Sequence, residues 1–164
     1  MPLLAAPSVA LLAPYTGSEM LPLYTTTVAV SGGEARHARA SGRAVSDDGN
    51  LDLVLRLPEA LGGNGGGTNP EQLFAAGFAA CFHGAMTLVA AARKIRLPHD
   101  IDIAATVTFG RDPADGLFLL RADLSVSLPA MDAEDAAALV AQAEKVCPYA
   151  KMARTGMQST VRLV

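Results

Sequence analysis

The segment from Pro70 to Arg96 predicts one long helix, and it constrains the fold more than any other part of the chain. Thr68 and Asn69 before it are good helix caps, and Thr68 with Glu71 has the spacing of a capping box. One face carries larger residues at helical spacing: Phe74, Phe78, Cys81, Ala85 and Leu88. Because the rest of the surface is mostly alanine, the helix is apolar on nearly all sides. We therefore expect it at the centre of the fold.

Segments on both sides of this helix predict antiparallel strands, because they are rich in β-branched residues or alternate apolar and polar positions. Asp132 is expected to cap a second helix, residues 133–146, which stops where Cys147 meets Pro148. We expect strands over residues 23–30, 50–58, 101–110, 117–129 and 158–164. Strands, a long helix, a hairpin, a helix and a last strand argue for an α+β fold over repeated βαβ units.

Length and composition bound the class of protein. The 164 residues suit one domain, with 51% hydrophobic and 18% charged residues. A net charge of -3 offers no basic surface for nucleic acid or anionic lipid, so we expect a small or apolar ligand. Two cysteines without a C-x-x-C pair suit a reducing, cytoplasmic location better than a secreted scaffold or a zinc site.

Residues 1–19 are predicted to be a mobile or surface-packed extension preceding a single domain at residues 20–164. The stretch is apolar but is broken by Pro7 and Pro14, and no Lys or Arg precedes its apolar run. A secretory signal needs a positive start, and a membrane helix needs about 20 uninterrupted apolar residues. A degenerate export segment is the alternative interpretation.

Most candidate chemistries lack an essential residue. The glycine-rich loop at residues 62–67 has no lysine in the position that a phosphate-binding loop needs. His37, His83 and His99 are scattered, so no metal site is expected. Because no serine lies in a G-x-S-x-G motif either, the cysteines remain as candidates.

Taken by itself, Cys81 is better explained as a small buried hydrophobe than as a reactive thiol. It lies in the middle of the predicted helix, so neither end of that helix lowers its pKa, and apolar surroundings raise it. A reactive Cys81 needs a cation, which a hairpin with arginines at positions 36, 39 and 43 could supply. Glu71 could hold such an arginine, or it could serve only as the capping-box acid. Cys147, at a helix C-terminus, suits a resolving thiol better than an attacking one.

Glu71 and Cys81 lie ten residues apart, or about 15 Å along a straight helix. They can share one site if a long arginine bridges them, if the helix breaks near Gly77, or if a second subunit contributes. A dimer whose central helices cross is the simplest of these solutions.

Several segments resemble the organic hydroperoxide resistance branch of the Ohr/OsmC proteins, which are thiol-dependent peroxidases. The resemblance covers residues 23–164. It is carried by LYTTTVAVSGG, AVSDDG, LGGNGGGTNPEQLFAAGFAACF and KVCPYAKMARTG, which stand in the family's order. It implies an α+β, OsmC-like fold with antiparallel sheets and a long central helix, assembled as an intertwined homodimer with active sites at the interface.

The resemblance also implies roles for individual residues. Cys81 becomes the peroxidatic cysteine, which attacks an alkyl or fatty-acid hydroperoxide, and Cys147 then forms a disulfide with it. A dithiol, in this family a lipoyl group, restores both thiols, and no bound cofactor is implied. Glu71 positions the active-site arginine, for which counting back from AVSDDG favours Arg39, with Arg36 as the alternative. The apolar lining at Phe74, Phe78 and Phe82 suits an organic peroxide.

Two other functions remain open from the sequence. One is an OsmC-like stress protein with the same two thiols but a different peroxide or reductant. The other is a non-catalytic module that binds an apolar ligand and keeps its cysteines inert.

Overall fold

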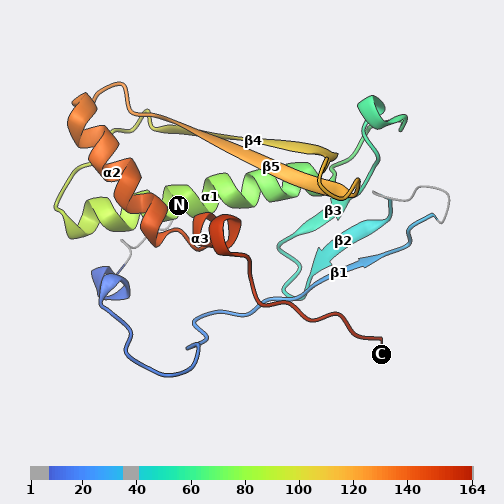
Figure 1. Cartoon of the computed structure of the whole chain (residues 1–164), viewed down its shortest axis with the longest axis horizontal. Helices are drawn as coiled ribbons and strands as arrows, with labels where there is room; N and C mark the ends of the chain where they lie inside the picture. Colours follow the sequence, from blue (N-terminus) through green and yellow to red (C-terminus); the bar gives the residue numbers. More distant parts are fainter. Residues whose placement is uncertain (1–7, 35–40, 164) are drawn as a thin grey trace. The chain divides into compact units, whose positions relative to one another are not determined.

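The computed structural model describes residues 8–34 and 41–163, which form two compact units (Figure 1). The larger unit combines the chain up to Pro14 with Ala75 onward, and the smaller unit is Tyr15–Phe74. Near the start, Val9–Leu12 forms a short 3-10 helix, η1. The proposed boundary between an extension and a domain at residues 19 and 20 stays a prediction.

The smaller unit contains a three-stranded antiparallel sheet in the order β1-β2-β3. Its strands are β1 (Val28–Ser31), β2 (Arg43–Ser46) and β3 (Asp52–Val54). The expected strands at 23–30 and 50–58 are therefore shorter than predicted. The central strand β2 was not predicted, because its four residues alternate too briefly to distinguish them from the polar segment around them. Its Ala44 and Ser46 point into the unit and are buried.

The glycine-rich loop of this unit is held by its own backbone. It follows the 3-10 helix η2 (Glu59–Leu61). The N–H of Gly63 donates to Pro58 O at 3.1 Å, and the N–H of Gly65 donates to Leu57 O at 3.2 Å. A Cβ on Gly63 would lie 2.0 Å from Leu57 O, so only glycine fits there. Close approach of the backbone therefore accounts for this glycine.

The larger unit is built on most of helix α1 (Pro70–Ala92) and a long hairpin. Strands β4 (Asp102–Arg111) and β5 (Phe118–Ser127) pair over ten residues each, close to the predicted ranges. The hairpin lies along α1, and helix α2 (Ala133–Val146) follows it (Figure 1). Asp132 caps α2 as predicted, accepting bonds from the N–H groups of Glu134 and Asp135.

Helix α1 ends four residues before the predicted position because its chain reverses at Lys94. This residue has a left-handed φ of 57°. The N–H of Ile95 donates to Ala90 O at 2.8 Å, and that of Lys94 donates to Ala91 O at 3.2 Å. These two bonds form a Schellman motif, which usually has glycine in the left-handed position. A lysine there gives no such signal in the sequence.

The end of the chain differs from the prediction in two ways. Pro148–Thr155 forms a further helix, α3, which was not expected. Residues 158–163 form no strand in the described chain, and Val161 and Leu163 are fully exposed. An alternating pattern becomes a strand only when a neighbouring strand satisfies its backbone groups, and the described chain provides none there.

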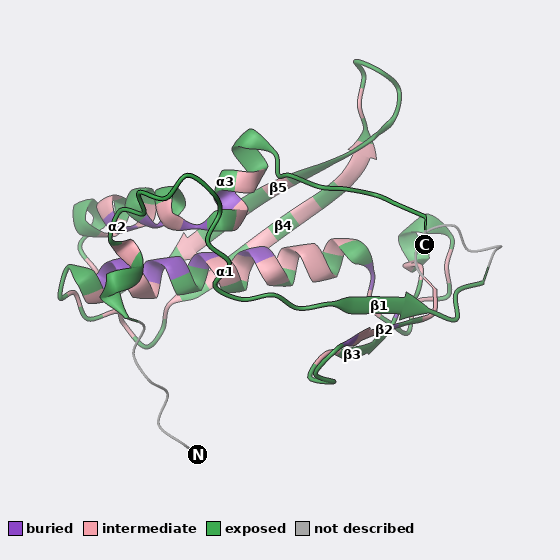
Figure 2. Ribbon diagram, turned by 90° about the horizontal axis from the view of Figure 1, so that it is seen from below, coloured by how far each residue is buried: buried purple, intermediate pink, exposed green. Residues whose placement is uncertain are grey.

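The core of the larger unit lies between α1, α2 and α3 (Figure 2). Met86, Leu139 and Cys147 are its largest fully enclosed side chains. Other residues of α1 are also buried: Phe78, Phe82, Ala85, Val89 and Ala90. The opposite face of α1 is exposed, including Ala80, His83 and Gly84. By length and composition α1 could cross a membrane, but a central helix of a water-soluble fold has the same character.

Candidate functional site

Two thiols meet inside the larger unit. The Cys147 S–H donates to the Cys81 sulfur, and the two sulfur atoms are 3.5 Å apart. Both cysteines are free; Cys81 is partly exposed and Cys147 is fully buried. A disulfide needs a sulfur separation of about 2 Å, so a small movement would join them. The structure therefore brings the two predicted thiols together within the larger unit.

Cys147 is held in place because it belongs to two helices. It is the C-cap of α2, with its N–H donating to Ala143 O at 2.8 Å. It is also the N-cap of α3, with its carbonyl accepting from the N–H of Lys151 at 3.0 Å. Its φ of -64° and ψ of 118° are extended, as a residue before proline requires. Pro148 ends α2 and is also suited to the first position of α3.

Opposing effects act on the pKa of the Cys81 thiol. Burial raises the pKa most, and the neighbouring Cys147 raises it further. A hydrogen bond from the backbone of Tyr149 lowers it, but the net direction is upward. The predicted effect of apolar surroundings is therefore confirmed. Cys81 lies in the middle of α1, as predicted, and the donor that lowers its pKa comes from the first turn of α3, a helix that was not predicted.

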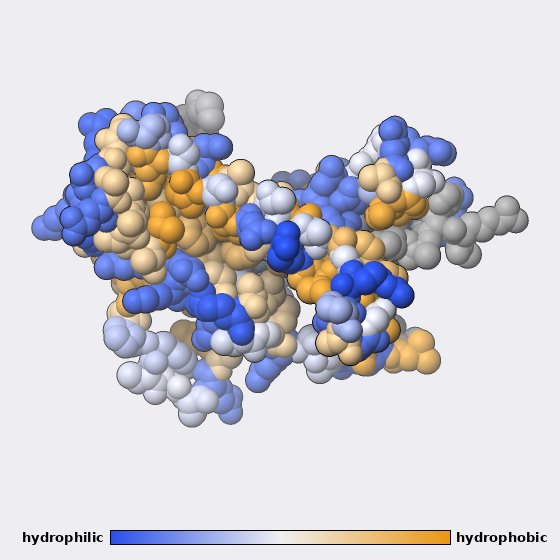
Figure 3. All heavy atoms as spheres, turned by 45° about the horizontal axis from the view of Figure 1, so that its top comes forward, coloured by the Kyte–Doolittle hydropathy of each residue, from blue (hydrophilic) through white to orange (hydrophobic). Residues whose placement is uncertain are grey.

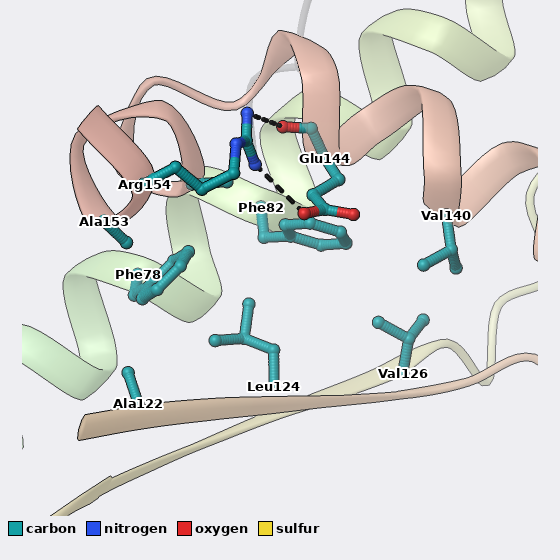
Figure 4. Close-up of a pocket in the computed structure, with 10 residues that line it drawn as sticks. Phe78, Phe82, Ala122, Leu124, Val126, Val140, Glu144, Ala153 and Arg154 are labelled. Carbon is teal, nitrogen blue, oxygen red and sulfur yellow. Dashed lines mark hydrogen bonds and ion pairs between the residues drawn. The ribbon is translucent and has the colours of Figure 1, made fainter.

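An apolar cavity of about 280 Å³ lies beside this part of α1 (Figure 4). Phe78 and Phe82, three residues before and one after Cys81, form one wall. The other lining residues are Ala122, Leu124 and Val126 of β5, Val140 of α2, and Ala150 and Ala153 of α3. Two charged residues also line the cavity, and Arg154 donates to the Glu144 carboxylate at 3.0 Å. Phe74, the third predicted pocket residue, belongs to the smaller unit and does not line this cavity.

A second hollow of about 480 Å³ adjoins the first between β5 and α2. The two share Leu124, Val126 and Val140. Apolar atoms gather on the surface over these elements (Figure 3). An extended apolar chain could therefore lie along β5 beyond the first cavity.

Glu71 is the second residue of α1, and the helix continues from it to Ala92 without interruption. A break near Gly77 is thus not how Glu71 and Cys81 could share a site. The predicted cap at Asn69 is confirmed, whereas the predicted capping box of Thr68 with Glu71 has the wrong residues. Asn69 Oδ1 accepts from the N–H of Gln72 at 2.9 Å, and the Thr68 hydroxyl donates to the Gln72 side chain at 3.0 Å. Asn69 is thus the cap, and Glu71 is not in the acid position of a capping box.

The predicted arginines divide into two cases. Arg36 and Arg39 lie outside the described residues, as does His37. Arg43 lies on β2 and makes a bidentate ion pair with Asp52 on β3, with Nη2 and Oδ2 2.6 Å apart. This pair raises the pKa of Arg43 and lowers that of Asp52. Among the described residues, no three metal-ligating side chains come together.

Three residues of the site were not identified from the sequence: Tyr149 beside Cys81, and Glu144 and Arg154 in the lining of the cavity. All depend on α3 following α2 directly. The available signal was Pro148 at a helix start, but it was interpreted only as the end of α2.

Comparison with known proteins relates most of the chain to one group. The family model described as OsmC-like protein matches residues 63–162. An organic hydroperoxide resistance protein of Xanthomonas axonopodis pv. citri is 45% identical over 86% of this chain and 94% of its own length.

Solved structures agree with this relationship. An organic hydroperoxide resistance protein from Legionella pneumophila superposes with a TM-score of 0.72 at 41% identity, over 83% of this chain and 93% of the other. One from Vibrio cholerae, with captopril in one of its active sites, gives 0.74 at 37% identity, over 84% and 90%.

Proposed function

Because this chain belongs to the OsmC family and groups with its organic hydroperoxide resistance proteins, we propose that it reduces organic hydroperoxides to alcohols through Cys81 and Cys147. The observation that carries the proposal is the 3.5 Å separation of the two sulfur atoms. Partial exposure of Cys81 and burial of Cys147 support their division into an attacking and a resolving thiol.

The proposed reaction has three steps. The Cys81 thiolate attacks the distal oxygen of the hydroperoxide; the O–O bond breaks, the alkoxide takes a proton to become the alcohol, and Cys81 becomes a sulfenic acid. The Cys147 sulfur then attacks the Cys81 sulfur, and water leaves as the disulfide forms. A dithiol such as dihydrolipoamide, free or on a lipoylated protein, reduces this disulfide and is itself oxidised to a disulfide.

The first step needs a thiolate, but burial and Cys147 raise the pKa of Cys81. A nearby cation would favour the charged form. We propose Arg39, or alternatively Arg36, in this role, with Glu71 positioning the arginine. Because α1 is unbroken, we propose a homodimer that assembles this site, and the exposed small residues of α1 offer a face for the second copy.

The cavity lined by Phe78 and Phe82 supports an alkyl or fatty-acid hydroperoxide as the substrate. Most of its lining is apolar, which suits an alkyl chain better than hydrogen peroxide. No bound cofactor enters the proposed chemistry, because the electrons come from the dithiol. Free thiols persist in a reducing compartment, so the proposed location is the cytoplasm.

Thiol counting before and after one equivalent of cumene hydroperoxide tests the proposal directly. We expect both thiols to be lost to one disulfide within the chain. Cys81→Ser should abolish turnover, whereas Cys147→Ser should permit a single event that leaves a sulfenic acid. Unchanged thiols would instead favour a non-catalytic module that binds an apolar ligand, and turnover by Cys81→Ser would refute the assigned roles.

Two further assays separate the proposal from an OsmC-like stress protein with other substrates. Rates with tert-butyl hydroperoxide should exceed those with hydrogen peroxide under the same reductant. Dihydrolipoamide should support turnover better than thioredoxin or glutathione. To identify the arginine, Arg39→Gln is expected to slow peroxide reduction strongly and Arg36→Gln only slightly. The reverse result would assign the role to Arg36.

A further inference from the structure

The ring of Tyr149 rests on α1 one turn before Cys81. A Cβ placed on Gly77 would lie 3.1 Å from Tyr149 Oη and 3.4 Å from its Cζ. The Tyr149 and Phe78 rings are tilted at 35° with their centroids 5.9 Å apart. The tyrosine ring therefore lies against Gly77, at a distance that leaves little room for a larger residue.

The backbone of Tyr149 reaches the reactive part of the same helix face. Gly77 and Cys81 are four residues apart, so they lie one above the other on α1. Tyr149 is the second residue of α3, where an N–H has no partner within its own helix. That N–H hydrogen-bonds the Cys81 sulfur. Cys147, the N-cap of α3, brings its own sulfur to 3.5 Å from the same atom.

We propose that Tyr149 is a positioning residue for Cys81: its ring, seated on Gly77 and Phe78, fixes the first turn of α3 so that its backbone N–H faces the Cys81 sulfur. This inference rests on the proposed function only for its effect on peroxide reduction. A donor aimed at the sulfur stabilises the thiolate relative to the thiol. The same contact holds Cys147 in register with Cys81, because Cys147 and Tyr149 belong to one turn.

Gly77→Ala tests the seating of the ring, because the added methyl group meets Tyr149 Oη at 3.1 Å. We expect a higher Cys81 pKa and alkylation by iodoacetamide about threefold to tenfold slower below that pKa. The rate is measured across pH 6–10 by mass spectrometry of the peptide that contains Cys81. Among the described titratable side chains, Cys147 faces this sulfur, and its state is followed in the same digest.

Two matched variants make the test specific. Gly84→Ala adds the same methyl group to the same helix, where it meets nothing within 4 Å, so the pH profile of Cys81 should not change. Tyr149→Phe removes the oxygen that causes the tightest contact and leaves Cζ at 3.4 Å. In that background, Gly77→Ala should have a much smaller effect than in the natural chain.

The inference is overturned if Gly77→Ala leaves the profile unchanged, or if it shifts the profile equally with and without the tyrosine oxygen. If Gly77→Ala does not fold, as judged by circular dichroism, Tyr149→Ala replaces it. That variant keeps the backbone N–H but removes the ring, and an unchanged Cys81 profile would refute the role. Alkylation needs no peroxide, so the alkylation rates would still test the role of Tyr149 if the protein had no peroxidase activity.

Discussion

Oxidation should stabilise this protein, because a Cys81–Cys147 disulfide would close a large loop. The two residues are 66 positions apart. A cross-link of that span removes about 14 to 15 cal/mol/K of chain entropy from the unfolded state, which corresponds to about 4 kcal/mol at 25 °C.

Part of this gain is offset in the folded state. The sulfur atoms start 3.5 Å apart and must approach by about 1.5 Å. Cys147 joins two helices and is fully enclosed, so this movement disturbs neighbouring packing. We therefore expect a net increase of about 2 to 4 kcal/mol in the free energy of unfolding.

Urea unfolding measures this difference. One sample is treated with one equivalent of cumene hydroperoxide and the other is kept in dithiothreitol, at equal protein concentration. With a slope of about 2 kcal/mol/M, the midpoint of the oxidised sample should lie about 1 to 2 M higher. Cys81→Ser, treated in the same way, should show no shift. Equal midpoints after loss of both thiols would show that the cysteines had not joined within one chain.

Three other outcomes are expected. In a double variant, Arg36→Gln with Arg39→Gln, the alkylation rate of Cys81 should keep rising past pH 9, because burial raises the pKa of this thiol above the ordinary 9.0. A plateau in that rate below pH 8 would argue against both arginines as the cation. Leu139→Ala should lower the free energy of unfolding by about 2 to 5 kcal/mol, measured in urea, because this side chain is fully enclosed. Asp48 has its pKa lowered from 3.8 to about 2 by hydrogen bonds, so its carboxylate stabilises the fold above pH 4 and loses this effect as the pH falls toward 2; the stability difference from Asp48→Asn should shrink over that range.

The sequence predicted those elements that have a recognisable cap residue or an alternating apolar pattern. Asp132 caps α2, because a single cap residue marks the start of a helix. The β4–β5 hairpin lies close to its predicted range, because an alternating pattern marks each of its strands. The end of α1 could not be predicted in this way. Its Schellman motif has Lys94 in the left-handed position, and the energy for that conformation comes from backbone bonds that composition does not reveal.

The candidate site shows the same division. Helical spacing placed Phe78 and Cys81 on one face, but no spacing argument brings Cys147 to a residue 66 positions away. That pairing came from the resemblance. The backbone donor of Tyr149 was unpredictable for another reason, since it depends on α3 starting at the residue where α2 was expected to end.

The single residue between α2 and α3 also limits how this chain can change in length. An α-helix turns by about 100° and rises about 1.5 Å per residue, so one residue inserted between Asp132 and Cys147 would swing the thiol away from α1. The fully enclosed site of Cys147 leaves no room to absorb such a rotation. Insertions and deletions among relatives should therefore collect in turns such as residues 112–117 and 62–67, while the spacing from Asp132 to Tyr149 stays constant.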